Sequence, residues 1–380
     1  MEKKVVIAGF ARSPFHFASK GELATVRPDE LAAQVVRGLL EQTGVDAKEI
    51  EDLILGCAFP EGEQGLNVAR IVGFLADLPL SVAGQTINRF CGSSMQAIHS
   101  AAGAIQLNAG EAFICAGVES MSRVPMMGFN PLPHPDLAER YREAYVSMGE
   151  TAENLARKYQ IPRAEQERFA VESHRKAAAA RSQGRFKNEI VPIRRPDGAT
   201  VAEDGCIRSD TNAEALSTLK PAFDQNGTVT AGTSSPLTDG AAAVLVTSED
   251  FAKAHGLKPL ARIRSVAVAG CAPEIMGIGP VGATQKALKR AGAKVSDLDV
   301  IESNEAFAVQ SMAVARDLML DAEKTNLDGG AIALGHPLGA TGARITGKAA
   351  ALLKRTGGEL ALSTQCIGGG QGIATVLEAV

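Results

Sequence analysis

The sequence predicts an α/β protein made of two similar halves with an inserted segment between them. Strand-like and helix-like stretches alternate along the chain, which is typical of α/β folds. Segments from the two ends of the chain resemble each other at a nearly constant separation of 245 to 248 residues. The chain has 380 residues, of which 45% are apolar and 22% charged, as expected for a folded protein of two or three domains.

The first third of the chain contains clear strand and helix signals. A helix is expected over Asp29–Thr43, with Asp29 as its N-cap after Pro28 and Gly44 as its C-cap. Short apolar runs predict buried strands at Val5–Ala8, Leu53–Leu55 and Ala112–Ala116.

The internal repeat is a helix, a glycine stop, an acidic turn and a strand. The stretch VVRGLLEQTGVDAKEIEDLILGC at 35–57 matches QKALKRAGAKVSDLDVIESNEAF at 285–307, with Gly44 and Gly292 separated by 248 residues. GEAFICAGVES at 110–120 matches GELALSTQCIG at 358–368, again separated by 248 residues. Asp52 and Asp297 also correspond, with a separation of 245 residues. Three similarities in the same order and at nearly one separation favour duplication over chance.

The middle of the chain, residues 121–237, has no counterpart in either half. It begins with a loop rich in Pro, Met and Gly (Pro125–Pro135) and continues as a charged, helical stretch. We therefore expect three units, namely residues 1–120 with 238–260, an inserted domain at 121–237, and residues 261–380.

The charge distribution argues against nucleic acid as a partner. The net charge is −4, so no overall field attracts a polyanion or an acidic membrane. Between Thr151 and Lys220, 13 Lys and Arg stand against 10 Asp and Glu, a net of +3 that leaves −7 for the rest. This segment suits a small polyanionic ligand, and it equally suits a solvated helical surface.

The six cysteines are dispersed along the chain. They form no C-x-x-C pair and no His–Cys cluster at metal-ligand spacing, so we expect reduced thiols and no metal site. No apolar run approaches the roughly 18 residues of a membrane span. Met1–Lys4 leads directly into the strand-like Val5–Gly9, so no signal peptide is expected, and the predicted location is the cytoplasm.

Cys91 is the first residue with a chemical context, in NRFCGSSMQAI at 88–98. It follows a short strand and precedes a helical run over Met95–Leu107. Free N–H groups at a helix N-terminus stabilise a thiolate, lower its pKa and can hold an oxyanion. From this context alone, a nucleophile and a buried structural thiol are equally favoured.

His336 is the second such residue, in GGAIALGHPLGATGARI at 329–345. Ala331–Leu334 is expected to be a strand, and Gly339 and Gly342 open a small-residue helix. A histidine in such a turn can deprotonate a thiol or donate to an enolate oxygen. His336 follows Cys91 by 245 residues, so the duplication places both at equivalent strand-to-helix turns, facing each other across a pseudo-twofold axis. The remaining histidines have surface or structural contexts, at positions 16, 99, 134, 174 and 255.

Cys366 is the third, in CIGGGQGIATVLE at 366–378. It could be a reactive thiol beside exposed backbone N–H groups. A phosphate-binding glycine loop would need a helix after it, but Ile373–Leu377 is strand-like, and no Lys-Ser/Thr pair is present. Two thiols and an imidazole fit acyl transfer better than nucleotide binding.

These motifs resemble those of the thiolase family over nearly the whole chain. The quoted motifs are joined, in family order, by VESMSRVP, MGETAENLA, VTAGTSSPLTDGAAAVLV and SNEAFA. The resemblance implies two βαβαβαββ halves in a five-layered α/β/α/β/α sandwich, with a loop domain that binds coenzyme A (CoA). It implies that CoA is a substrate and that no cofactor is permanently bound.

The resemblance also implies a mechanism and a set of residues. Cys91 would attack a 3-ketoacyl-CoA with help from His336, and Cys366 would protonate the released enolate. One oxyanion hole would use His336 and a water held by Asn304, the other the N–H groups of Cys91 and Gly368. The residues implied for CoA and the substrate tunnel are Arg208, Ser235, Met148, Phe223, Met276 and Phe307.

Two departures bear on specificity and assembly. Acetyl-specific members often carry His before the Met-Gly of MGETAEN, where this chain has Ser147, and the loop from Glu119 to Met148 looks shorter. Both favour a degradative enzyme for longer chains in fatty acid beta-oxidation. The assembly implied is a homodimer or homotetramer, and a complex with a hydratase/dehydrogenase subunit stays open.

Three alternatives remain at this point. A biosynthetic acetyl-CoA C-acetyltransferase shares every catalytic residue. A carrier-protein ketoacyl synthase would normally pair Cys with two histidines, whereas SNEAFA and Cys366 stand here in place of the second. A non-catalytic lipid-binding relative should have lost at least one of Cys91, His336 and Cys366, and all three are present.

Overall fold

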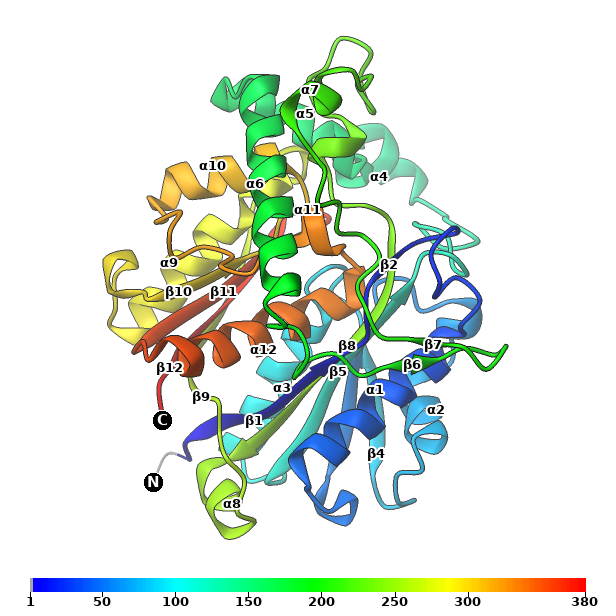
Figure 1. Ribbon diagram of the computed structural model, residues 1–380, viewed down its shortest axis with the longest axis vertical. Coiled ribbons are helices and arrows are strands. Elements are labelled where there is room, and N and C mark those ends of the chain that lie inside the picture. The colour runs from blue at the N-terminus through cyan, green and yellow to red at the C-terminus, as the bar shows by residue number, and fades with distance from the viewer. Residues whose placement is uncertain (1–2) are drawn as a thin grey trace.

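The computed structural model describes residues 3–380 and contains one large sheet flanked by helices on both faces (Figure 1). The order of strands is β10-β11-β12-β9-β1-β8-β5-β3-β4, and β2 pairs with β8. The strands are β1 (Val5–Arg12), β2 (His16–Phe17), β3 (Asp52–Gly56), β4 (Ala83–Ile87), β5 (Ala112–Ser120), β8 (Thr238–Ser248), β9 (Ala261–Gly270), β10 (Val300–Ser303), β11 (Leu360–Ile367) and β12 (Gln371–Glu378).

The sheet consists of two equivalent halves joined by a short contact between β1 and β9. Among the described residues, β1 and β9 pair through Val6 with Arg262 and Ile7 with Ala261. The first half runs β1-β8-β5-β3-β4 and the second runs β9-β12-β11-β10. In both halves the two strands at the start are antiparallel and the inner pairs β3/β5 and β10/β11 are parallel. At the position equivalent to β4, the second half has a single parallel bridge between Ile301 and Thr325.

The helices form three layers around the two half-sheets. Helices α1 and α2 cover one outer face, α9 and α10 lie on the other side, and α3 and α12 contact strands of both halves in the middle. This arrangement confirms the duplicated five-layered fold. The layer helices are α1 (Pro28–Thr43), α2 (Val68–Leu75), α3 (Ser93–Gln106), α9 (Gly279–Ala291), α10 (Ala308–Leu318) and α12 (Leu338–Thr356), and the two halves also contain the short helices α8 (Glu249–Ala254) and α11 (Ala331–Leu334).

The predicted repeat corresponds to matching elements. Helices α1 and α9 both end on a left-handed glycine, Gly44 with φ of 70° and Gly292 with φ of 65°. Each of these glycines donates its N–H to a carbonyl near the end of its helix, Leu40 in one case and Leu288 in the other. A left-handed C′ residue is readily adopted by glycine, which explains why both copies keep it.

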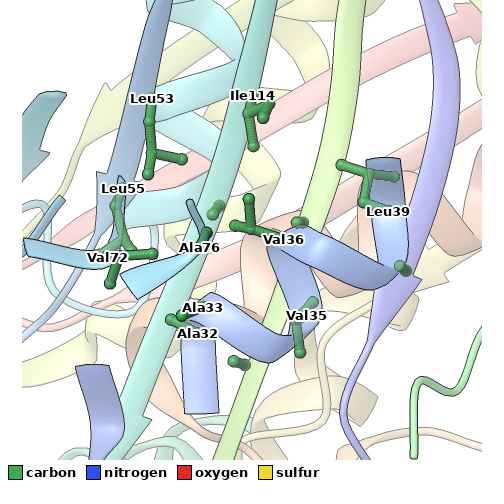
Figure 2. Packing of buried hydrophobic residues seen from close by; sticks show 14 of the residues in the cluster. Ala32, Ala33, Val35, Val36, Leu39, Leu53, Leu55, Val72, Ala76 and Ile114 are labelled. Carbon is green, nitrogen blue, oxygen red and sulfur yellow. The ribbon is translucent and has the colours of Figure 1, made fainter. Parts of the chain in front are cut away.

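The apolar core of the first half lies between α1 and the sheet (Figure 2). Val36 and Leu39 on α1 point toward Ile114 on β5, and all three side chains are fully buried or nearly so. Apolar residues at helical spacing on α1 thus meet the alternating residues of the strands. This packing holds the ends of β3 and β5, from which the functional loops emerge.

Residues 121–237 contain mostly helices and turns between β5 and β8. The long helix α6 runs from the loop-rich end of the molecule down past α11 (Figure 1). The segment comprises α4 (Pro135–Arg140), α5 (Met148–Tyr159), α6 (Arg163–Ser182), α7 (Ala213–Ser217) and the hairpin of β6 (Ile193–Arg194) with β7 (Thr200–Val201). Short 3-10 helices complete the chain at 47–49, 62–64, 142–145, 231–233, 273–278 and 295–297.

Two local predictions are wrong. The residues Ala331–Leu334 form the one-turn helix α11 and no strand. Their N–H groups find partners without a sheet neighbour: that of Ile332 donates to the Glu305 carboxylate, and that of Leu334 to the Gly330 carbonyl. A four-residue apolar run has too little periodicity to separate the two states.

The other correction concerns the start of α1. Its N-cap is Arg27, and Pro28 occupies the first turn. Asp29 lies inside that turn, where its carboxylate accepts hydrogen bonds from the Arg27 guanidinium and from the N–H of Glu30. Pro has no N–H and a fixed φ, so it favours the first helical position and moves the start one residue earlier.

Candidate active site

Cys91 lies in a tight turn between β4 and α3. Phe90, the residue before it, has φ of +43°, a left-handed conformation that is unfavourable for a residue with a side chain. The Asn88 carboxamide accepts from the N–H of Phe90 at 2.8 Å, and the Ser93 hydroxyl accepts from the N–H of Arg89 at 2.9 Å. These two contacts hold the turn and place Cys91 just before α3.

The Cys91 thiol is buried, and two backbone N–H groups face it. Burial raises the pKa of Cys91 to about 11, and the negative charge of Glu119 also raises it, while hydrogen bonds from the N–H groups of Gly368 and Cys91 lower it. The expected lowering of the Cys91 pKa is therefore wrong for the resting protein, because loss of water outweighs the N–H groups. The same two N–H groups are the predicted oxyanion hole.

His336 lies at the corresponding position of the second half, just before α12, but its turn follows the helix α11 and is not the expected strand-to-helix turn. The turn needs Gly335, whose φ is +107°, and the N–H of His336 donates to the Thr238 hydroxyl at 3.0 Å. Nδ1 of the ring lies 2.7 Å from the Thr341 hydroxyl, and Nε2 lies 3.4 Å from Nδ2 of Asn304. Burial, aided by the charge of Arg344, lowers the pKa of His336 to about 3, so the ring is neutral.

Asn304 follows the end of β10 and is fully buried. Its N–H donates to the Thr364 carbonyl at 3.0 Å, which ties it to the neighbouring strand. Its Oδ1 has no hydrogen-bond partner among the described residues. A buried carbonyl oxygen of this kind is suited to accept from a water or a substrate group.

Cys366 lies near the end of β11, with 1% of its surface exposed. Burial raises the pKa of its thiol, and ionisation of Cys91 raises it further, so the two sulfurs are near neighbours. The following glycines form the turn of the β11–β12 hairpin, in which Gly369 and Gly370 have φ of 77° and 79°. The glycines therefore serve a hairpin turn, as expected when no helix follows.

Most residues implied for the substrate tunnel gather beside Cys366. Met148, Met276 and Phe307 pack in one apolar cluster with it. Phe223 lies edge-on to Phe307 with ring centroids 5.9 Å apart, and 46% of it is exposed. The apolar cluster beside the Cys366 thiol thus extends through Phe307 to the exposed ring of Phe223.

Ser235 and Arg208 occupy different surroundings. The N–H and hydroxyl of Ser235 both donate to the Ala306 carbonyl, next to Phe307. Arg208 is exposed, and its guanidinium lies 5.0 Å from the centre of the Phe17 ring. Arg208 therefore does not join the cluster around Cys366.

Ser147, the position that departs from acetyl-specific relatives, caps helix α5. Its hydroxyl accepts from the N–H of Glu150, and the Glu150 carboxylate accepts from the N–H of Ser147, which makes a capping box. A local helix-capping role therefore accounts for Ser147 in this structure.

Sequence reasoning missed several residues that hold the site. Thr341 and Thr238 orient His336, and Gln365 donates to the Cys91 carbonyl. Glu119 is fully buried and contacts loops of both halves. Thr341, Thr238 and Glu119 all lie within quoted motifs, and Glu119 had a further signal, a carboxylate at the end of an apolar strand.

Residues 3–380 contain neither a metal-binding cluster nor a helix suited to span a membrane. No group of three or more His, Cys, Asp or Glu side chains in that range is placed to hold a metal ion. Within the same range, no helix is long and apolar enough to cross a membrane.

The duplicated fold, with a buried thiol before one central helix and a buried imidazole before the other, suits acyl transfer. Residues 5–250 match the family model "Thiolase, N-terminal domain", and residues 257–379 match "Thiolase, C-terminal domain". The chain therefore belongs to the thiolase family.

Individual relatives agree over full length. The chain is 49% identical to a 3-ketoacyl-CoA thiolase of Bacillus subtilis, with 100% of both chains covered. It is 51% identical to a 3-ketoacyl-CoA thiolase of Marinobacter nauticus, covering 100% of this chain and 99% of that one. The crystal structure of human mitochondrial 3-ketoacyl-CoA thiolase in complex with CoA superposes with a TM-score of 0.92 at 39% identity, covering 100% of this chain and 98% of that one.

Proposed function

We propose that this chain cleaves 3-ketoacyl-CoA with CoA, giving acetyl-CoA and an acyl-CoA shortened by two carbons, as in fatty acid beta-oxidation. The observations that carry the proposal are two contacts between segments that bear buried candidate residues: the charge of Cys91 acts on the Cys366 thiol, and Cys91 packs in one apolar cluster with Leu338, two residues after His336. Full-length relatives named 3-ketoacyl-CoA thiolases support it.

In the first half-reaction, the Cys91 sulfur attacks the ketone carbon while Nε2 of His336 takes the thiol proton. The bond between the second and third carbons of the acyl chain then breaks. The shortened acyl group stays on Cys91 as a thioester, and the electron pair leaves on the enolate of acetyl-CoA. Cys366 gives its proton to that enolate, which releases acetyl-CoA and leaves Cys366 as a thiolate.

In the second half-reaction, CoA takes the acyl group from Cys91. The Cys366 thiolate accepts the proton of the CoA thiol, whose sulfur attacks the thioester. The leaving Cys91 sulfur recovers its proton from His336, so every group returns to its starting state. One thioester replaces another, and this balance in energy makes the transfer reversible.

Charge that develops during these steps needs stabilisation at two places. The N–H groups of Cys91 and Gly368 face the reacting sulfur and suit the oxyanion formed at the attacked carbon. His336 and Asn304, 3.4 Å apart, suit the enolate oxygen. Loss of one such donor typically costs about 3 kcal/mol of transition-state stabilisation.

The acyl-enzyme step is tested by intact-mass spectrometry. After mixing with acetyl-CoA or a 3-ketoacyl-CoA, the native protein should gain the mass of one acyl group, and the Cys91→Ser variant should gain none. A native protein that cleaves substrate without any adduct would overturn the mechanism. A native protein with neither adduct nor turnover would support a non-catalytic lipid-binding role instead.

We further propose a preference for chains longer than four carbons. Ser147, at the position where acetyl-specific relatives often carry His, supports this preference. The second candidate, an acetyl-CoA C-acetyltransferase, is tested by comparing kcat/KM for acetoacetyl-CoA with that for 3-ketodecanoyl-CoA. A strong preference for the four-carbon substrate would favour that candidate.

The remaining assignments are proposals as well. Residues 121–237 would form the CoA-binding domain, inserted into an N-terminal half of 1–120 with 238–260, followed by a C-terminal half of 261–380. Arg208, Ser235, Met148, Phe223, Met276 and Phe307 would contact CoA or the acyl chain. The strand β4 lies at the edge of the sheet, and Leu66 and Leu80, in the loops before α2 and β4, are exposed, which supports a homodimer or higher oligomer. Free thiols at all six cysteines support a cytoplasmic location.

A further inference from the structure

We propose that Glu119 is a positioning residue, which sets the spacing between Cys91 and His336 by holding loops of both halves on one buried carboxylate. This inference rests on the proposed function. Glu119 lies near the end of β5, with 1% of its surface exposed. It touches neither the Cys91 thiol nor the His336 ring through a hydrogen bond, so it would act through the segments that carry them.

A single oxygen of Glu119 joins the two halves. Oε2 accepts from the N–H of Ala58 at 2.8 Å and from the N–H of Gly339 at 2.9 Å. Ala58 lies in the loop after β3 of the first half. Gly339 lies in the first turn of α12, three residues after His336, so the helix that carries the His336 turn is anchored directly to β5.

On the Cys91 side, the link continues through Asn88. The Ala58 carbonyl accepts from the Asn88 amide at 3.0 Å, and the Asn88 carboxamide oxygen accepts from the N–H of Phe90 at 2.8 Å. Phe90 directly precedes Cys91. Two hydrogen bonds and one residue thus separate the loop held by Glu119 from the strained turn of the nucleophile.

The other oxygen of Glu119 makes the arrangement rigid. Oε1 accepts from the Gln64 amide at 2.8 Å and from the N–H of Phe59 at 3.2 Å, and the Cys57 thiol lies 3.6 Å away. Gln64 in turn accepts from the N–H of Ser120 at 2.6 Å. Within residues 3–380, no Lys, Arg or His lies at ion-pair distance from this carboxylate.

The chemistry of the five partners requires a carboxylate. All of them are donors, and a carboxylate is acceptor-only when ionised. A glutamine at this position would turn its own N–H groups toward donors and leave buried groups unpaired. The negative charge also acts on Cys91 and favours its neutral thiol.

The contact between the halves is close enough to need small residues. A Cβ on Gly339 would lie 2.7 Å from the Gly56 carbonyl oxygen and 2.8 Å from the Cys57 Cα. A Cβ on Gly117 would overlap the Gly339 carbonyl. The start of α12 therefore has no freedom to slide on β5, and a displacement of about 1 Å in such a site can cost 10²-fold in rate.

The test compares Glu119→Gln and Glu119→Asp with the matched control Asp299→Asn. Asp299 also accepts from two backbone N–H groups, those of Glu359 and Leu360, but lies at the far end of β10. Two quantities are measured on each full-length protein: kcat and KM for 3-ketoacyl-CoA, and the pH dependence of Cys91 alkylation by iodoacetamide without substrate.

Glu119→Gln should lower kcat about 100-fold with little change in KM, and should move the alkylation profile to lower pH because the nearby negative charge is gone. Glu119→Asp keeps the charge but is shorter by one methylene. It should keep the native alkylation profile and still lower kcat about tenfold. Asp299→Asn should match the native protein in both measurements.

Native kcat in a folded Glu119→Asp or Glu119→Gln protein would overturn the positioning role. If Glu119→Gln does not fold, Glu119→Asp carries the test alone. If Glu119→Asp shifts the alkylation profile as much as Glu119→Gln does, opening of the site and not loss of charge causes the shift. That result would overturn the electrostatic effect of Glu119 on Cys91. The alkylation measurement needs no substrate, so it decides the electrostatic effect of Glu119 on Cys91 even if the native protein fails to cleave 3-ketoacyl-CoA, and that failure would count against the proposed function and not against this effect.

Discussion

Nδ1 of His336 lies 2.7 Å from the hydroxyl oxygen of Thr341, and that hydroxyl donates its proton to the Pro337 carbonyl 3.0 Å away. Because the hydroxyl proton is used there, the hydroxyl must accept from Nδ1, which therefore carries the ring proton. Nε2 is left without a proton and faces the Asn304 amide. The tautomer follows from this network, and it makes Nε2 the basic nitrogen.

Replacement of Thr341 by valine should lower kcat about 100-fold while KM changes little, because the ring loses the acceptor that fixes its tautomer and orientation. Steady-state kinetics on the purified variant measure both. The control is Thr346→Val on the same helix, where a buried hydroxyl contacts Ser363 and no site residue. Equal losses in the two variants would mean that general loosening of α12, and not the His336 contact, lowers the rate.

Alkylation of Cys91 should accelerate steeply with alkaline pH. The pKa of Cys91 is raised to about 11 by burial and that of His336 is lowered to about 3, so both groups are neutral near pH 7. The rate with iodoacetamide, followed on the Cys91 peptide by mass spectrometry, should rise about tenfold per pH unit up to about pH 10. A plateau between about pH 5 and 8 would instead reveal a preformed thiolate–imidazolium pair and contradict the neutral resting state.

The protein should lose stability as the pH falls below about 6.5. Burial lowers the pKa of His99 to about 3, of His174 to about 4 and of His336 to about 3. The unfolded chain therefore binds more protons than the folded one between the folded and unfolded pKa values, and stability present at neutral pH is lost toward acid.

Urea unfolding at a series of pH values measures this effect. The variant His99→Gln removes one of the three groups. Its free energy of unfolding should therefore fall less steeply toward acid than that of the native protein, by up to about 1.4 kcal/mol per pH unit. His255→Gln serves as the control, since His255 is exposed. An unchanged slope in His99→Gln would show that His99 is already protonated in the folded protein.

The crossing of the two central helices should not tolerate a methyl group. A Cβ on Gly342 of α12 would overlap the backbone nitrogen of Met95 on α3, whereas a Cβ on Gly103 of α3 meets nothing within 4 Å. Gly342→Ala should destabilise the protein by about 1 to 3 kcal/mol or prevent folding. Gly103→Ala should stabilise it by about 0.5 to 1 kcal/mol, because alanine loses less entropy in a helix. Thermal unfolding of both variants compares the two effects, and a stable Gly342→Ala protein would contradict the close crossing.

Much of the fold was predictable because the signals are local and repeated. Glycine stops at Gly44 and Gly292, apolar strands and matched spacings do not depend on distant contacts. Where the signal was short, as at Ala331–Leu334, the prediction failed, because the Glu305 carboxylate supplies a partner that no local pattern reveals.

The sequence by itself determined the duplication and the correspondence of Cys91 with His336. It also showed that the glycines after Cys366 do not form a phosphate-binding loop. All three follow from order and spacing along the chain. Only the tertiary structure decided the ionisation of the site and how its turns are held. The pKa of Cys91 depends on burial and on the charge of Glu119, and the His336 tautomer depends on Thr341. Burial and hydrogen bonds between distant segments arise only when the two halves pack together. Spacing along the chain therefore cannot show whether the pKa of Cys91 is raised or lowered, or which nitrogen of His336 carries the proton.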